Sequence, residues 1–297
     1  MKTATAAQLV PPPNIRIVDS LARVVKPTPR RIVLRTRGHR HGPITRLVSP
    51  SNVGELIKPF VFLDHAEVAP RPGPLFGIHP HSGIATLTVV LGGGLRYEDT
   101  TGKSGEVPTG GLEWMRAGNG VWHDGAPTPG DPLRAFQLWV ALPAAEENGP
   151  AESQYIAPAE VQEDGPIRVV LGSYGSAFSS IRAPAGIYYF HVRLEDRERW
   201  RYQPPAGHTV AWLAVDRGGL LSTEEIPEGT LAVFEKSNGA IEVQAKGDTS
   251  FVFGSAIPHP HRLVLGNYSV HTSSNALVRG EAEIRRIGAQ LHAEGRL

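Results

Sequence analysis

The chain has 297 residues, which is enough for one large or two medium-sized domains, each with its own core. It holds 33 glycines and 26 prolines without a repeat period, which excludes a collagen-like chain, and it has no cysteine, which excludes a disulfide framework and a thiol nucleophile. The net charge is only +1, but residues 1–50 carry ten Lys or Arg against one acid, a charge of +9. Residues 51–297 therefore have a net charge of 1 − 9 = −8.

The basic N-terminal stretch is predicted to be an extended, proline-rich arm over residues 1–30, with one short helix near Ile17–Val25. Such an arm could contact nucleic acid or an acidic partner, or its arginines could cover the acidic remainder of the chain. We favour the second interpretation and do not expect direct nucleic-acid binding, because no aromatic residue that could stack on bases precedes Phe60. No signal peptide or membrane-spanning run is apparent, and we expect a cytoplasmic protein.

Residues 31–145 are predicted to form a first antiparallel β domain. Apolar segments of strand length alternate there with turns rich in glycine and proline, which is typical of a barrel or a sandwich. The predicted strands are Arg31–Leu34, Ile44–Val48, Phe60–Leu63, Ile84–Leu91, Leu95–Asp99, Leu112–Arg116, Val121–His123 and Arg134–Leu142.

Residues 146–165 are polar and turn-rich and are predicted to be a linker to a second β domain over residues 166–297. That domain is expected to end in a short helix, because Ile284, Ile287 and Leu291 follow helical spacing. We therefore predict an all-β protein of two stacked antiparallel β-barrels with short terminal helices. The strands predicted in the second barrel are Ile167–Leu171, Ile187–Leu194, Val210–Val215, Thr230–Phe234, Ala240–Ala245 and Ser250–Phe253.

The candidate metal ligands are His79, His81 and His123. His79 and His81 are one residue apart, and alternate residues of a strand point to the same face, so this pair offers two imidazoles to one point. His123 lies in another predicted strand of the same domain. A three-histidine metal site inside a barrel is the hypothesis, and histidines bound only to the surrounding structure are the alternative.

The other histidines are expected to be structural. His65 ends a predicted strand, and the pair His39 and His41 lies in a basic surface turn. The tripeptide His259-Pro260-His261 repeats the first pair, with His271 ten residues on. Its alternating prolines favour a loop or an edge, so a second metal site is not expected there.

Four segments within residues 59–143 carry a resemblance to a known family. They are PFVFLDH at 59–65, GIHPHSG at 77–83, LEWMRAGNGVWH at 112–123 and FQLWVALP at 136–143. Together and in this order they resemble the pirin family of the cupin superfamily. The resemblance implies two cupin barrels and one metal site in the first, held by His79, His81 and His123. The metal implied is Fe(II), with Zn, Ni, Mn or Cu as alternatives.

The chain departs from the family pattern at the fourth ligand. The family has a glutamate two residues after the third histidine, and this chain has Gly125 there. Asp124 could replace that carboxylate only if the strand bulges, because the pleat points it to the other side of the strand from His123. Without it, three neutral imidazoles leave the charge of the metal uncompensated, which favours an anionic ligand.

Two further residues are candidates for proton transfer or for orienting a histidine. They are Glu113 and Gln137; the alternative is that Glu113 lies on the outer strand face and that Gln137 is a packed strand amide. The three tryptophans of the first domain, at 114, 122 and 139, are core residues or walls of an aromatic pocket.

Three functions remain open from the sequence. The first is an iron-dependent dioxygenase of a flavonol (quercetin) or another small enolisable substrate, the first role that the resemblance implies. The second is a metal-dependent, redox-sensing regulator that binds a protein partner. The third is a degenerate cupin whose metal site is weakened by Gly125.

Overall fold

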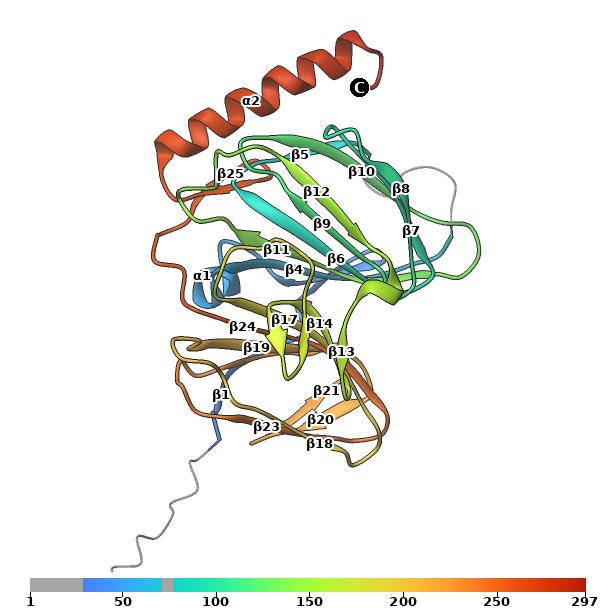
Figure 1. Cartoon of the computed structure of the whole chain (residues 1–297), viewed down its shortest axis with the longest axis vertical. Helices are drawn as coiled ribbons and strands as arrows, with labels where there is room; N and C mark the ends of the chain where they lie inside the picture. Colours follow the sequence, from blue (N-terminus) through green and yellow to red (C-terminus); the bar gives the residue numbers. More distant parts are fainter. Residues whose placement is uncertain (1–28, 71–76) are drawn as a thin grey trace, which may run out of the picture.

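The computed structural model describes residues 29–70 and 77–297, so the arm and the helix predicted near Ile17–Val25 lie outside the described residues, except for the end of the arm. Two β-barrels are stacked along the long axis of the molecule, and one long helix lies across the free end of the first barrel (Figure 1). The predicted fold class, two stacked antiparallel barrels, is confirmed.

The first barrel is made of a seven-stranded and a four-stranded sheet, with orders β12-β9-β6-β11-β4-β3-β2 and β5-β10-β7-β8. A five-residue helix, α1 (Val53–Ile57), precedes β4. The strands are β2 (His39–His41), β3 (Ile44–Val48), β4 (Phe60–Val68), β5 (His79–His81), β6 (Ile84–Gly92), β7 (Gly94–Asp99), β8 (Ser104–Pro108), β9 (Leu112–Arg116), β10 (Val121–Pro127), β11 (Leu133–Ala141) and β12 (Glu152–Ile156).

The second barrel repeats this plan with the orders β1-β22-β19-β24-β17-β14-β13 and β18-β23-β20-β21. A 3-10 turn, η1 (Pro158–Glu160), leads into it. The strands are β1 (Ile32–Thr36), β13 (Glu163–Asp164), β14 (Ile167–Leu171), β17 (Ile187–Leu194), β18 (Arg199–Tyr202), β19 (Val210–Arg217), β20 (Gly219–Leu221), β21 (Glu225–Pro227), β22 (Leu231–Phe234), β23 (Ile241–Ala245) and β24 (Thr249–Ala256). The hairpins β15 (Ser173–Tyr174) with β16 (Ala177–Phe178) and β25 (Val264–Gly266) with β26 (Ser269–His271) complete the strands.

The largest apolar cluster lies between the barrels, where residues of both seven-stranded sheets pack together. Phe60 of β4 meets Trp212 of β19 edge to face, with ring centroids 5.3 Å apart. Side chains alternate along each strand, so the residues between those of this cluster face the barrel interiors. In β6, for example, Leu87 is in the inter-barrel cluster, while Thr88 lines a cavity of the first barrel.

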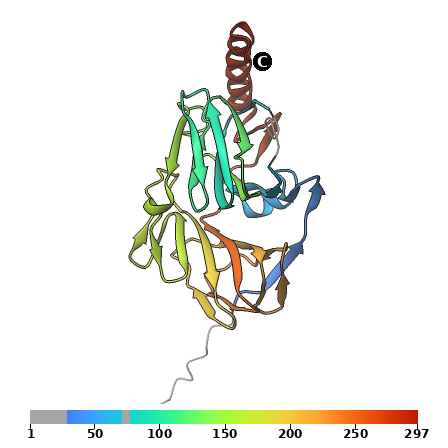
Figure 2. The same cartoon turned by 90° about the vertical axis from the view of Figure 1, so that its right-hand side faces the viewer.

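The domain boundaries differ from those predicted. β1 pairs with β22 and so belongs to the second barrel, and Figure 2 shows this blue segment running along one side from the second barrel towards the first. β12, inside the predicted linker, pairs with β9 of the first barrel. Both are edge strands whose partners are distant in sequence, so no local pattern assigns them to a barrel.

The C-terminal helix α2 (Ser274–Ala293) has 20 residues and is longer than predicted. It begins at the N-cap Ser273, whose side chain accepts a hydrogen bond from the Ala276 amide. Its buried face packs on the first barrel rather than on the second, and the Trp122 indole donates to the Ile284 carbonyl at 2.9 Å. No helix among the described residues is long and apolar enough to cross a membrane.

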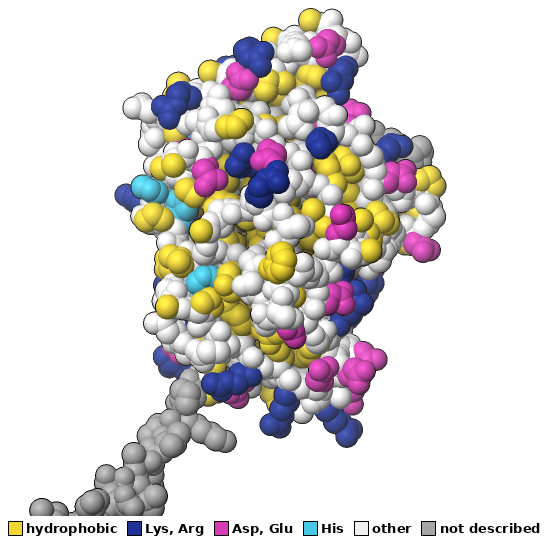
Figure 3. All heavy atoms as spheres, in the orientation of Figure 1, with side chains coloured by type: hydrophobic (Ala, Val, Ile, Leu, Met, Phe, Trp, Pro, Cys, Tyr) yellow, Lys and Arg dark blue, Asp and Glu magenta, His cyan; other side chains and the backbone are white. Residues whose placement is uncertain are grey.

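The described surface carries charges of both signs. On the face shown in Figure 3, acidic and basic side chains are interspersed with hydrophobic ones, and no single sign dominates that face. Exposed ion pairs join neighbouring strands, as in Arg201–Glu242, and the two barrels, as in Arg217–Glu67, and such pairs contribute little to stability.

Candidate metal centre

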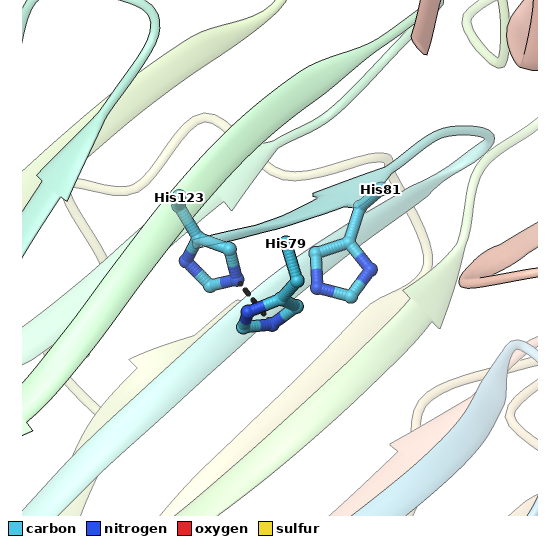
Figure 4. Close-up of side chains that lie close together, drawn as sticks. All are labelled: His79, His81 and His123. Carbon is cyan, nitrogen blue, oxygen red and sulfur yellow. Dashed lines mark hydrogen bonds between the residues drawn. The ribbon is translucent and has the colours of Figure 1, made fainter. Parts of the chain in front are cut away.

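Two paired strands bring the three predicted histidines together. His123 of β10 lies directly opposite His79 of β5, and His81 follows on the same face of β5 (Figure 4). The three donor nitrogens all lie within 4.8 Å of one another, and among the described residues this is the one group of three or more potential donors. His81 and His123 are buried, and His79 is half-buried.

The distances suit one metal ion. The Nε2 atoms of His79 and His123 are 3.1 Å apart, the contact drawn as a dashed line in Figure 4. Two nitrogens bound to one ion at about 2.0–2.1 Å lie roughly 3.0–3.4 Å apart. The three imidazoles therefore fit a mononuclear centre without a large movement.

The Nδ1 atoms of the three histidines, which point away from the centre of the cluster, lie near oxygen atoms. Nδ1 of His79 donates to the Gly77 carbonyl at 2.8 Å, and Nδ1 of His81 donates to the Tyr268 carbonyl at 3.1 Å. Nδ1 of His123 lies 4.0 Å from Oε1 of Glu113. Oxygen partners of this kind fix ring orientation in metal sites, and for His79 and His81 they leave Nε2 free of its proton.

Burial keeps these imidazoles neutral. It lowers the pKa of His81 to about 3 and that of His123 well below its usual value, and neighbouring histidines add to both shifts. The pKa of His79 is also lowered, mainly by burial. Because a metal binds the neutral imidazole, protons compete weakly for this site near pH 7.

A row of polar side chains on the larger sheet faces the histidines. The strand registers place Asp64 beside Gln137, Gln137 beside Thr88, and Thr88 beside Glu113. All four line a small inner cavity of 70 Å³ together with His79 and His123. The structure thus brings Glu113 and Gln137, the two residues predicted to transfer protons or orient a histidine, next to the three histidines.

Glu113 is buried in the barrel interior, so the alternative of an outer-face position is wrong. Thr88 donates to its Oε2 at 2.8 Å. Burial raises the pKa of Glu113 to about 7, and the Asp99 charge adds to the shift, whereas the Thr88 hydrogen bond opposes it. The charge of a bound cation favours the ionised carboxylate.

Asp124 does not join the donor cluster. It is partly exposed, and its Oδ1 accepts a hydrogen bond from the Gly125 amide at 2.8 Å. Gly125 borders the inner cavity, and a Cβ built there would lie 3.3 Å from Cδ1 of Leu95. At the position of the family glutamate, the backbone of Gly125 therefore faces open cavity space and the Leu95 side chain.

A larger outer cavity of 490 Å³ opens beside His79. Phe62 and Trp139 stack in its wall with ring centroids 4.1 Å apart, and the Arg46 guanidinium lies 4.1 Å from the Phe62 ring. His79, Asp64 and Gln137 border both cavities. The two spaces therefore meet at His79, the half-buried member of the three-histidine cluster.

The remaining histidines lie elsewhere. His39 and His41 are exposed on β2, and His65 bonds to Asp216 of the second barrel at 3.1 Å. His259 and His261 lie in a loop, with Nε2 of His259 near the Leu142 carbonyl at 3.3 Å, and they are outside the donor cluster found among the described residues. Among the tryptophans predicted to be core residues or pocket walls, Trp114 lies in the core and Trp139 in a pocket wall.

The sequence did not point to Thr88, Asp64 or Tyr268. Thr88 and Asp64 follow from strand register, which period-two alternation shows only when the partner strands are known. Tyr268 acts through its backbone carbonyl, and no residue-type signal could have found it.

The sequence model of the pirin family, described as Pirin, matches residues 43–140. A Vibrio cholerae protein provisionally named a quercetin 2,3-dioxygenase is 35% identical over 193 residues, which cover 59% of this chain and 67% of that protein. The chain belongs to the pirin family. A second provisionally named quercetin 2,3-dioxygenase, from Pseudomonas aeruginosa, is 29% identical over 73% of this chain and 81% of its own length.

Solved structures agree with the pirin fold. A quercetin 2,3-dioxygenase of Acinetobacter baumannii superposes with a TM-score of 0.78 at 23% identity, covering 87% of this chain and 98% of that one. The bacterial pirin YhhW of Escherichia coli in complex with nickel(II) superposes with a TM-score of 0.60 at 20% identity, covering 77% and 98%. At these identities the likeness establishes the fold alone.

Proposed function

We propose that this pirin is a mononuclear metal-dependent dioxygenase, with iron as its metal, that acts on a flavonol-like or other small enolisable aromatic substrate. The observation that carries the proposal is the convergence of three neutral imidazoles, two buried and one half-buried, at the meeting point of two cavities. The names of the Vibrio and Pseudomonas relatives support the substrate class.

His79, His81 and His123 would hold the metal. Iron bound by imidazoles with open coordination positions supplies dioxygen activation, and Zn, Ni, Mn or Cu would also suit these donors. Among residues 29–70 and 77–297 no carboxylate joins this donor set, so the centre would keep more positive charge than one with a carboxylate ligand. We infer that it binds a deprotonated enol more strongly than a neutral substrate.

Glu113 and Gln137 are proposed to act on the ligands and the substrate. Glu113 places a carboxylate 4.0 Å from Nδ1 of His123, where it offsets part of the metal charge and favours one ring orientation. Gln137 borders both cavities, so its amide can donate to a substrate oxygen next to the metal.

The outer cavity is proposed to bind the aromatic body of the substrate. Its volume of 490 Å³ lies within the range of about 300–1,000 Å³ that is common for small-molecule sites. Trp139 and Tyr268 border it and offer ring faces and edges. Arg46 also borders it, with its guanidinium paired to the Asp64 carboxylate at 2.7 and 3.0 Å. We also propose a cytoplasmic location, with which a chain lacking cysteine is compatible.

The test is oxygen consumption by the iron-loaded protein with quercetin. We expect uptake that depends on quercetin and is lost in His81→Ala but kept in His261→Ala, a matched change in the second His-Pro-His tripeptide. Stoichiometric iron without oxygen uptake would contradict the dioxygenase proposal and leave the sensor hypothesis. Failure to bind any metal would leave the degenerate cupin.

A further inference from the structure

Four polar residues form a continuous hydrogen-bonded chain behind the strand that carries His79 and His81. The Ser82 hydroxyl contacts Nε2 of His271 at 2.7 Å, and Nδ1 of His271 contacts Oε2 of Glu147 at 3.0 Å. The same carboxylate accepts hydrogen bonds from the Thr272 amide at 2.7 Å and the Thr272 hydroxyl at 2.6 Å. Ser82, His271 and Glu147 are at most 2% exposed.

The order serine, histidine, carboxylate is also that of a hydrolytic triad. Ser82 is 0% exposed, however, and a Cβ built on Gly280 of α2 would lie 2.2 Å from its hydroxyl oxygen. The helix therefore closes over the hydroxyl, and no scissile carbonyl can reach it. These residues therefore hold parts of the structure in place and do not act on a substrate.

These hydrogen-bonded side chains connect segments that are far apart in the sequence. Ser82 directly follows β5, Glu147 lies in the turn before β12, and His271 ends β26 of the C-terminal hairpin. Ser82 also forms a bridge with Ser269 in the same hairpin. The C-terminal hairpin is thus held against the strand of the metal ligands by buried side chains.

The hairpin supplies the partner of one metal ligand. Tyr268, in the β25–β26 turn, gives its backbone carbonyl to Nδ1 of His81 at 3.1 Å. Its φ of 59° lies in the left-handed region, which a tyrosine adopts only where its surroundings hold it. The side-chain hydrogen bond between Ser82 and His271, together with a backbone bond from the Val270 amide to the Ser82 carbonyl at 3.2 Å, holds the hairpin that carries this turn.

We propose that Ser82, His271 and Glu147 are positioning residues that hold the C-terminal hairpin so that the Tyr268 carbonyl keeps Nε2 of His81 directed at the metal. This inference rests on the proposed metal centre. It makes the C-terminal segment a part of the site in the first barrel, although that segment follows the second barrel in the chain.

The test compares two serine-to-alanine variants of the full chain. Ser82→Ala breaks the positioning chain, and Ser153→Ala removes a similarly buried hydroxyl that donates to Asp99 at 2.6 Å in the same barrel. Titration with Co(II) should show affinity lowered on the order of 10-fold for Ser82→Ala, as expected for the loss of an outer interaction, and unchanged for Ser153→Ala. The visible Co(II) spectrum should change only in Ser82→Ala.

A second variant and a metal-free readout complete the test. Glu147→Gln should weaken Co(II) binding in the same way. In ¹H–¹⁵N spectra of the metal-free protein, His81 should carry its proton on Nδ1 in the wild type and in Ser153→Ala, and exchange between tautomers in Ser82→Ala and Glu147→Gln.

Equal affinities and equal His81 tautomers in Ser82→Ala and Ser153→Ala would overturn the inference. A wild type that binds no Co(II) would instead defeat the proposed metal centre. The tautomer comparison would still decide whether the C-terminal hairpin positions His81.

Discussion

The two barrels share one strand plan but fill their interiors in different ways. The first encloses three histidines and a facing row of polar side chains around a cavity. The second is filled by an aromatic cluster, in which Phe253 lies 4.7 Å from Tyr202 and 5.0 Å from Trp200, measured between ring centroids. The same architecture thus gives one barrel a cavity lined by histidines and the other a packed core.

The difference shows where each barrel obtains its stability. Large rings remove much apolar surface from water in the second barrel. The first barrel gathers buried ionisable groups around its cavity, and such groups cost free energy unless they are neutral, hydrogen-bonded or bound to a metal. We therefore expect the second barrel to control folding stability and the first to control ligand binding.

The largest effect should follow from opening the aromatic core of the second barrel. Phe253→Ala should lower the free energy of unfolding by about 3–5 kcal/mol, because it removes a fully buried ring and leaves a cavity. Denaturant unfolding measures the loss. Metal affinity of the folded fraction should not change, and a large change would show that the barrels are not separate in function.

The second barrel also contains a buried histidine that is not a metal ligand. Burial, aided by nearby arginines, lowers the pKa of His191 to about 3. The unfolded chain takes up this proton below about pH 6.5 while the folded chain does not, so stability is full above that pH and falls as the pH drops towards 3, by roughly 1.4 kcal/mol per pH unit.

His191→Gln should remove this loss from the metal-free protein. Denaturant unfolding between pH 4 and 8 gives the comparison, and only the difference between variant and wild type is interpreted. An identical pH slope in the two proteins would mean that His191 is not buried in its neutral form.

Glu113 should show the opposite dependence in the first barrel. Its folded pKa of about 7 is raised above its usual value, so the stability that it contributes is present at low pH and is lost as the pH rises through 7, up to about 3 kcal/mol. Glu113→Gln should therefore stabilise the metal-free protein more at pH 8 than at pH 5. The reverse order in unfolding measurements would contradict a buried Glu113.

The smallest expected effect concerns the missing carboxylate. Gly125→Glu should tighten binding of a divalent metal on the order of 10-fold, the scale that one changed interaction around a metal produces. A Cβ at this position meets the Leu95 side chain at 3.3 Å, so that side chain must move to admit it. Gly125→Ala is the matched control, since it fills space without adding a donor. Equal metal affinities of Gly125→Glu and Gly125→Ala would show that no donor is missing at this position.

The strand pattern predicted antiparallel β domains and the shared face of His79 and His81, and the resemblance to the pirin family added the cupin barrels and the ligand set with His123. His79 and His81 share a face because of the strand period, and the pairing of β5 with β10 places His123 opposite His79. The face of Glu113 could not be predicted, because four of the five residues of its strand are buried and no polar alternation marks the interior side.

Long-range connections account for the other differences. β1 and β12 are edge strands that join barrels by pairing across large sequence separations. The C-terminal helix has a helical pattern, but nothing in that pattern says which barrel it covers. The contact of Tyr268 with His81 arises because the C-terminal hairpin packs on the first barrel, and it uses a backbone carbonyl, which no side-chain pattern marks.

Metal stoichiometry tests the central claim most directly. We predict that the purified chain, reconstituted with Fe(II) under anaerobic conditions, binds one equivalent of metal by elemental analysis. His123→Ala should abolish that binding, and His259→Ala should leave it unchanged. Two equivalents, or one equivalent that survives His123→Ala, would contradict a single metal centre confined to the first barrel.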